Sequence, residues 1–111
     1  MYNYYCSKEE NKHYKNNIKH IAYVDNEKII SKYELTPLDS RNSFCGKALL
    51  LMTVDNIYCL SYDTIVCGID RKTGELHKYW NDWSATTMRH INSFLHANGK
   101  PTLNKKTWLA L

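Results

Sequence analysis

The segment from Ser84 to Pro101 constrains the fold more than any other part of the sequence. The Ser84 hydroxyl can accept a hydrogen bond from the free amides of a first helical turn. Gly99 stands where a left-handed residue commonly ends a helix, and Pro101 prevents continuation. Between them, apolar side chains recur at helical spacing on one face: Met88, Ile91, Phe94 and Leu95. The sequence therefore predicts an amphipathic helix over residues 84–98.

Ahead of this helix, short segments of β-type composition alternate with turn signals, such as the pairs Asp25-Asn26 and Asp55-Asn56. The β-type segments are residues 20–24, 28–35, 47–54, 57–62, 64–69 and 75–80. The first two favour a hairpin, and the other four favour a meander. We therefore predict an α+β fold in which an antiparallel β-meander packs against the helix. A short terminal helix, capped by Asn104, is expected to follow.

The domain organisation follows from length and composition. The chain has 111 residues, enough for one domain with its own core. Residues 1–17 are rich in Asn, Lys and Tyr and show no clear hydrophobic period. We predict a weakly structured N-terminal arm over residues 1–17 and a single α+β domain over residues 18–111.

The first residues show no basic segment followed by an apolar run, and no stretch approaches the roughly 20 apolar residues that span a bilayer. We therefore expect a cytoplasmic protein without a membrane partner. The four cysteines form no C-x-x-C pair, which argues against a zinc site, and a reducing cytosol disfavours disulfides. We expect Cys59 and Cys67 to be small apolar residues in strands, and we expect no metal and no cofactor.

Positive charge is concentrated in the last third of the chain. Residues 71–111 carry seven Lys and Arg side chains against two acidic ones. This excess is compatible with a nucleic acid or an acidic protein as partner. It is equally compatible with a charged surface that only keeps the protein soluble.

Four ordered strings of residues carry a resemblance to known proteins. They are residues 35–40, 43–48, 60–66 and 83–92, and the most specific parts are Ser-Tyr-Asp-Thr at 61–64 and Ser-Ala-Thr-Thr-Met-Arg-His-Ile at 84–91. Together they resemble a family of small proteins from phages and mobile elements of low-GC Gram-positive bacteria. The resemblance covers about residues 35–111. It implies a phage or mobile-element origin, and because the family is a domain of unknown function it implies no reaction.

The polar side of the helix is the first candidate binding surface. Its polar side chains follow helical steps of three and four or lie beside them: Thr86, Arg89, His90, Ser93, His96 and Lys100. A helix that presents these donors outward could follow a DNA groove or a phosphate backbone. The alternative is that an amphipathic helix simply needs a polar outside.

The turn between Trp80 and Trp83 is the second candidate. Two tryptophans beside a short turn could stack on bases or anchor a protein interface. The alternative is that they pack the last strand against the helix, with Trp83 and Met88 forming a hydrophobic staple.

The Ser-Tyr-Asp-Thr string is the third candidate. A catalytic interpretation would pair Ser61 or Asp63 with a histidine, but no known nucleophile, phosphate-loop or metal motif is present. The leading expectation is therefore a non-enzymatic protein that binds a host protein or nucleoprotein complex. An inhibitor of a bacterial defence system, such as an anti-CRISPR protein, would be one example. The first alternative is an accessory protein that binds DNA or RNA through the basic helix face, and the second is a small enzyme.

Overall fold

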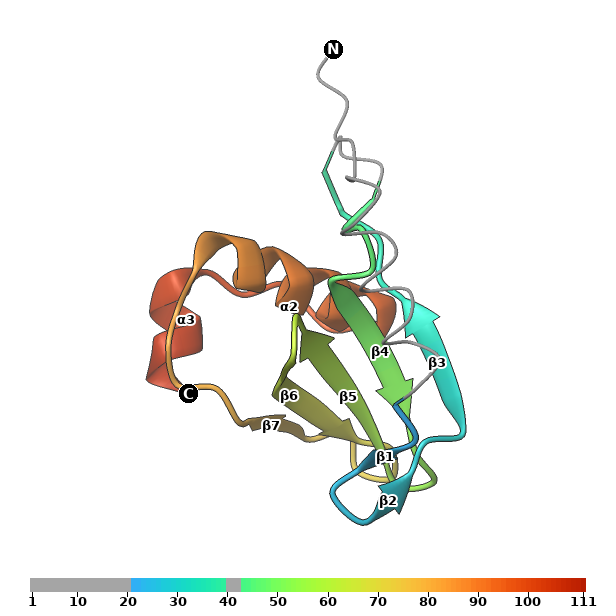
Figure 1. The fold of residues 1–111 in the computed structure, drawn as a ribbon. Coiled ribbons are helices and arrows are strands. Elements are labelled where there is room, and N and C mark those ends of the chain that lie inside the picture. Colours follow the sequence, from blue (N-terminus) through green and yellow to red (C-terminus); the bar gives the residue numbers. More distant parts are fainter. Residues whose placement is uncertain (1–20, 40–42) are drawn as a thin grey trace.

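The computed structural model describes residues 21–39 and 43–111. The arm predicted for residues 1–17 lies outside the described residues. In the described part, five antiparallel strands form a sheet in the order β3-β4-β5-β6-β7 (Figure 1). The strands are β3 (Ser31–Glu34), β4 (Ala48–Met52), β5 (Asn56–Ser61), β6 (Thr64–Asp70) and β7 (Leu76–Lys78). Each strand pairs with the next along the chain, which confirms the predicted meander.

The predicted hairpin is present but is smaller than expected. β1 (Tyr23–Val24) pairs with β2 (Glu27–Lys28) as a separate two-stranded sheet, and Asp25 in the turn has a φ of 51°. The prediction of one strand over residues 28–35 is wrong, because the segment leaves the hairpin after β2. Its second half becomes β3 and pairs with β4. As β3 this half extends the large sheet by pairing with the buried strand β4. The strand β1 is too short to pair with the whole segment.

Two helices follow the sheet. α2 (Ala85–Ala97) begins after Ser84, whose side-chain oxygen accepts from the backbone amide of Thr87 at 3.0 Å. It ends before Gly99, which has a φ of +70°. α3 (Lys105–Ala110) begins after Asn104, which caps it in the same way. These observations confirm the predicted α+β class, both helices and both caps.

The sheet buries apolar side chains on both faces. On one face, α2 and Trp108 of α3 share a core with alternate residues of the central strands, including Ala48 and Leu50 of β4. On the opposite face, Leu49 and Leu51 of β4 form a second core with residues around the β1–β2 hairpin. The side chains of this second core are Val24, Ile29, Leu49, Leu51, Tyr58 and Leu60. Strand alternation explains how one strand serves both cores.

One carboxylate joins the hairpin to the large sheet. Glu27 of β2 accepts hydrogen bonds from the Thr53 hydroxyl at 2.8 Å, from the Asn56 amide at 2.8 Å and from the Tyr58 hydroxyl. Burial raises the pKa of the Glu27 carboxyl, but the hydrogen bonds from Tyr58, Asn56 and Thr53 outweigh it and hold the pKa below its ordinary value. The carboxylate is therefore charged at neutral pH, and its three bonds are charge-assisted.

The helix cap gives a stability prediction. Replacing Ser84 by Ala removes the acceptor for the Thr87 amide, so we expect unfolding free energy to fall by about 1 kcal/mol. In a thermal melt this corresponds to a lower Tm by roughly 4–8 °C. Thr86→Ala is the matched control, because Thr86 is exposed in the first turn and forms no cap. Equal Tm values for Ser84→Ala and Thr86→Ala would contradict the capping role.

Candidate functional site

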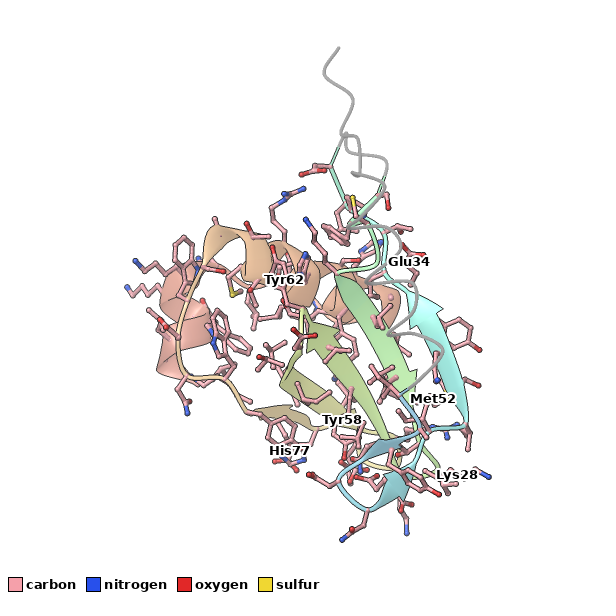
Figure 2. All side chains as sticks on the ribbon, viewed as in Figure 1. Lys28, Glu34, Met52, Tyr58, Tyr62 and His77 are labelled. Atoms are coloured by element: carbon pink, nitrogen blue, oxygen red, sulfur yellow. The ribbon has the colours of Figure 1, made fainter. Side chains whose placement is uncertain are left out.

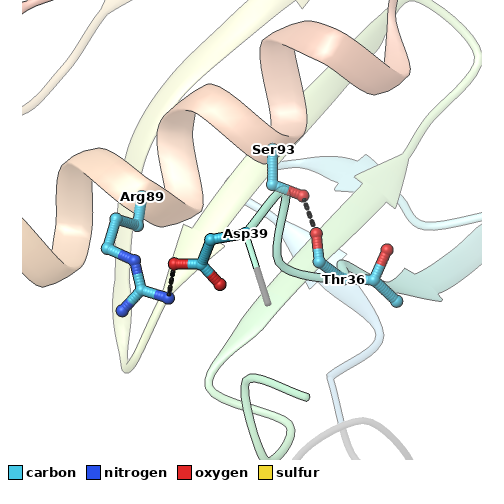
Figure 3. Close-up of polar contacts among 4 residues, drawn as sticks. All are labelled: Thr36, Asp39, Arg89 and Ser93. Carbon is cyan, nitrogen blue, oxygen red and sulfur yellow. Dashed lines mark hydrogen bonds and ion pairs between the residues drawn. The ribbon is translucent and has the colours of Figure 1, made fainter. Parts of the chain in front are cut away.

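The structure does not place the predicted polar stripe of α2 on one exposed face. Arg89 is half-buried, and its guanidinium donates to Asp39 at 2.6 Å in an ion pair (Figure 3). Ser93 is buried and donates to the backbone carbonyl of Thr36 at 2.6 Å (Figure 3). Both residues therefore fasten α2 to the segment that follows β3.

His90 is also buried, with 1% of its surface exposed. Its ring lies edge-on to Phe44 with centroids 4.5 Å apart, and 5.5 Å from the ring of Tyr62. The expectation that His90 and Ser93 lie on the outer face of the helix is wrong. The loop residues that follow β3 and precede β4 pack against the flank of α2 and bury it. Of the stripe, Thr86 and His96 are exposed, and Arg89 and Lys100 are half-buried.

Ser61 and His90, which a catalytic interpretation would pair, do come together. The Ser61 hydroxyl lies 2.8 Å from Nδ1 of His90 and 3.3 Å from the hydroxyl of Thr87. All three side chains are buried. Burial, followed by the charges of Arg89 and Lys47, lowers the pKa of His90 to about 4. The pair has the spacing of a serine–histidine dyad, but its buried position and its fit to the Thr87 hydroxyl are those of a satisfied polar cluster in the core.

The two tryptophans lie against the helices. Trp80 packs 6.3 Å from Trp108 between ring centroids, and both Trp80 and Trp83 contact the core beneath α2. The ammonium of Lys105 lies 4.7 Å from the ring of Trp83. These contacts agree with the packing alternative. The indole N–H of Trp83 is nevertheless buried and has no hydrogen-bond partner among residues 21–39 and 43–111.

Much of the positive charge in the last third of the chain is used inside the molecule. Arg71 donates to the backbone carbonyls of Thr53 and Val54, and Lys78 donates to the carbonyl of Trp108. With the Arg89 ion pair and the stacked Lys105, four of the seven basic side chains have internal contacts. The other three, Lys72, Lys100 and Lys106, have no such contact with the described part of the chain.

The cysteines and acidic residues of the described part do not form a metal site. No group of three or more His, Cys, Asp or Glu side chains among residues 21–39 and 43–111 is placed to hold a metal ion. Cys59 and Cys67 are free and buried in paired strands, as predicted. Burial raises the pKa of the Cys59 thiol, which keeps it protonated and unreactive. Cys45 is disulfide-bonded, which contradicts the expectation that disulfides are disfavoured here.

A cavity of about 420 Å³ lies on the sheet face opposite α2, beside the β1–β2 hairpin. Three of its lining residues are tyrosines: Tyr23 and Tyr79 are 61% and 51% exposed, whereas Tyr58 is buried. The other lining residues are Ile21, Val24, Asp25, Leu51, Leu60 and Ile65. An apolar concave site with a few polar groups is the usual form of a binding site. We name it the tyrosine cavity.

Two features shape the tyrosine cavity. The ring of Tyr58 lies across Gly68 of the next strand, so close that a Cβ at Gly68 would come within 2.9 Å of it. The Tyr58 ring can occupy this position because Gly68 has no side chain. The ring of Tyr79 lies beside that of Tyr58, with the two centroids 6.2 Å apart. Figure 2 labels Tyr58 on the sheet near the hairpin.

The electrostatics of the tyrosine cavity are negative. Within the part of the chain that the structure describes, Asp25 is the charged residue that lines it. Burial raises the pKa of the Tyr79 hydroxyl, and the charges of Glu27 and Asp25 raise it further. Burial and the Glu27 hydrogen bond raise the pKa of Tyr58 in the same way. Two carboxylates therefore act on the tyrosine rings.

Sequence reasoning did not predict this cavity. Its lining comes from the hairpin, three strands and the residue after β7, so no short motif contains it. One signal was available. Nine of the 111 residues are tyrosines, and the alternation at 75–80 placed Tyr79 with His77 on one face. A tyrosine at the end of an edge strand indicates an amphipathic surface.

Comparison with known proteins identifies the class of this chain. Residues 33–110 match a family described as a family of unknown function, DUF8033. The match covers more than half of the chain, and the protein therefore belongs to that family. No curated protein and no solved structure matches the sequence. Among the described helices, none has the length and apolar character to span a bilayer.

The buried histidine gives a prediction on pH. Below its ordinary pKa of 6.5, His90 binds a proton in the unfolded chain, but in the folded chain it does so only near pH 4. Stability contributed by neutral His90 is thus complete above pH 6.5 and is lost as pH falls toward 4. The slope should approach about 1.4 kcal/mol per pH unit.

Urea unfolding at several pH values between 7 and 4 measures this dependence. His90→Asn offers Ser61 a side-chain partner without a titrating ring, so its stability should vary less over the same range. Parallel curves for the wild-type protein and His90→Asn would refute the assignment.

Proposed function

We propose that this chain is a non-enzymatic binding protein of a phage or mobile element. It binds a host protein within a nucleoprotein complex in the bacterial cytoplasm and thereby occludes or modulates that complex. An inhibitor of a defence system, such as an anti-CRISPR protein, is one example of such a role. The proposed origin is supported by the resemblance of the strings at 35–40, 43–48, 60–66 and 83–92 to phage and mobile-element proteins.

The observation that carries protein binding is the tyrosine cavity. Tyr23 and Tyr79 expose more than half of their surface at the edge of a concave apolar floor. Tyrosine is enriched among the residues that dominate binding energy at protein interfaces. A buried aromatic or aliphatic side chain of a partner is the kind of group such a surface receives.

The structure gives less support to direct nucleic-acid binding. The proposed basic face has lost His90 and Ser93 to the core and Arg89 to an ion pair with Asp39.

Affinity capture from bacterial lysate tests protein binding. We expect the wild-type protein to retain a host protein after nuclease treatment. Tyr79→Ala combined with Tyr23→Ala should remove it, because both rings border the cavity. Tyr33→Ala is the matched control, since Tyr33 is 55% exposed and does not line the cavity. Recovery of nucleic acid alone, or equal loss in the control, would reject the proposal.

A gel shift with bare duplex DNA or RNA tests the alternative. We expect no shift at physiological salt, because most of the basic side chains of residues 71–111 already have contacts inside the molecule and leave few for phosphates. The alternative predicts an affinity that falls steeply with salt concentration, by about one power of salt for each phosphate contact. A shift of that kind, abolished by combined Lys72→Ala, Lys100→Ala and Lys106→Ala, would establish direct nucleic-acid binding instead.

A further inference from the structure

The charge and the aromatic lining of the tyrosine cavity limit the kind of side chain that it can bind. We propose that it receives a lysine side chain from the protein partner, with the ammonium group beside Asp25 and the tyrosine rings. This inference rests on the proposed function, since it supposes a protein partner, and it specifies the residue that enters the cavity.

The first argument is charge. Among the described residues that line the cavity, Asp25 is the charged one, and it belongs to the turn of the β1–β2 hairpin. Glu27, two residues later, holds a second carboxylate at the hydroxyl of Tyr58. Burial raises the pKa of the Tyr79 hydroxyl, and the charges of Glu27 and Asp25 raise it further. A cation entering the cavity would meet the Asp25 carboxylate and, among the described lining residues, no positive charge.

The second argument is the aromatic wall. The faces of tyrosine rings carry negative electrostatic potential, so they attract ammonium groups that lie within about 6 Å of the ring centre. Tyr58 and Tyr79 have centroids 6.2 Å apart and planes inclined by 38°, and Tyr23 borders the same space. Tyr58 also donates its hydroxyl proton toward Glu27, and this hydrogen bond to a carboxylate polarises the phenol.

The third argument is the aliphatic floor. Ile21, Leu60 and Ile65 line the cavity without any charge of their own. A lysine carries a four-carbon stem that can cover such apolar surface while its ammonium remains near water and carboxylates. The volume of about 420 Å³ lies within the range of side-chain and small-ligand sites, roughly 300–1,000 Å³. A purely apolar side chain would leave Asp25 without a partner, and an acidic side chain would be repelled.

The test uses the full chain and two small probes in NMR titrations. The first is lysine with its α-amino and carboxyl groups blocked as amides, and the second is the same molecule acetylated on the ε-nitrogen. We expect the cationic probe to shift the signals of Tyr79 and Ile65 and the neutral probe to leave them in place. Asp25→Asn should weaken the cationic probe roughly fivefold, which is the upper range for an exposed ion pair.

The variants are chosen to keep the fold. Asn tolerates the left-handed backbone that Asp25 adopts at a φ of 51°. Tyr79→Leu keeps an apolar side chain at an exposed position and removes one ring, so it should also weaken the cationic probe. Tyr33→Leu, at an exposed tyrosine outside the cavity, should bind as the wild type does.

Several results would overturn the inference. These are equal binding of the neutral probe, absence of any shift at millimolar probe, or binding that neither Asp25→Asn nor Tyr79→Leu weakens. Shifts of the same signals with protein concentration alone would identify a second copy of the chain as the occupant and also overturn it.

The probe and capture experiments separate the two proposals. Capture lost with the tyrosine variants but intact in Asp25→Asn would leave protein binding standing and reject the lysine. Binding of the cationic probe as expected, without any captured protein, would support the lysine site and reject the proposed binding of a host protein.

Discussion

The central strands of the sheet are apolar on both faces, and the rest of the structure depends on covering both. In β4, Ala48 and Leu50 point into one core while Leu49 and Leu51 point into the other, and all four are buried. A sheet with one wet face would alternate between apolar and polar residues instead. α2 and Trp108 of α3 cover the first face. On the second, within the described part of the chain, the cover comes from the β1–β2 hairpin and Ile29.

The hairpin contributes four strand residues, so burial of its apolar area alone stabilises its contact with the sheet only weakly. The Glu27 carboxylate anchors the hairpin to the sheet, because Asn56 and Tyr58 of β5 and Thr53 of the preceding turn all donate hydrogen bonds to this carboxylate. A lowered pKa for a partly buried carboxyl shows that these bonds outweigh the cost of desolvation. The same bonds fix the position of Tyr58 and so create one wall of the tyrosine cavity. Where the hairpin ends, the second face is left concave between Tyr23 and Tyr79.

What could be predicted from the sequence was local in origin. Ser84, Gly99 and Asn104 determine helix ends through bonds within a few residues, and strand pairs joined by short turns need little else. The sequence did not predict the buried flank of α2, because how much of the helix is buried depends on segments that pack against it from elsewhere in the chain. Ser93 donates a hydrogen bond to Thr36, which lies 57 residues away in the sequence, and His90 is hydrogen-bonded to Ser61, 29 residues away. His90 also contacts the ring of Phe44. The cavity was missed for the same reason, because strand register brings its lining together.

The limits of the family match add to this argument. The match begins at residue 33, so it includes the cavity floor from Leu51, Leu60 and Ile65 and the rings of Tyr58 and Tyr79. It excludes the hairpin, which contributes Tyr23 and Asp25, the charged residue among the described ones that line the cavity. The strings at 35–40, 43–48, 60–66 and 83–92 instead meet at the flank of α2, where Arg89, His90 and Ser93 hold loops to the helix. The matched region therefore provides the scaffold and an apolar, aromatic floor. Asp25, which gives the cavity its negative charge, precedes that region, so the family match does not extend to the proposed preference for a cationic side chain.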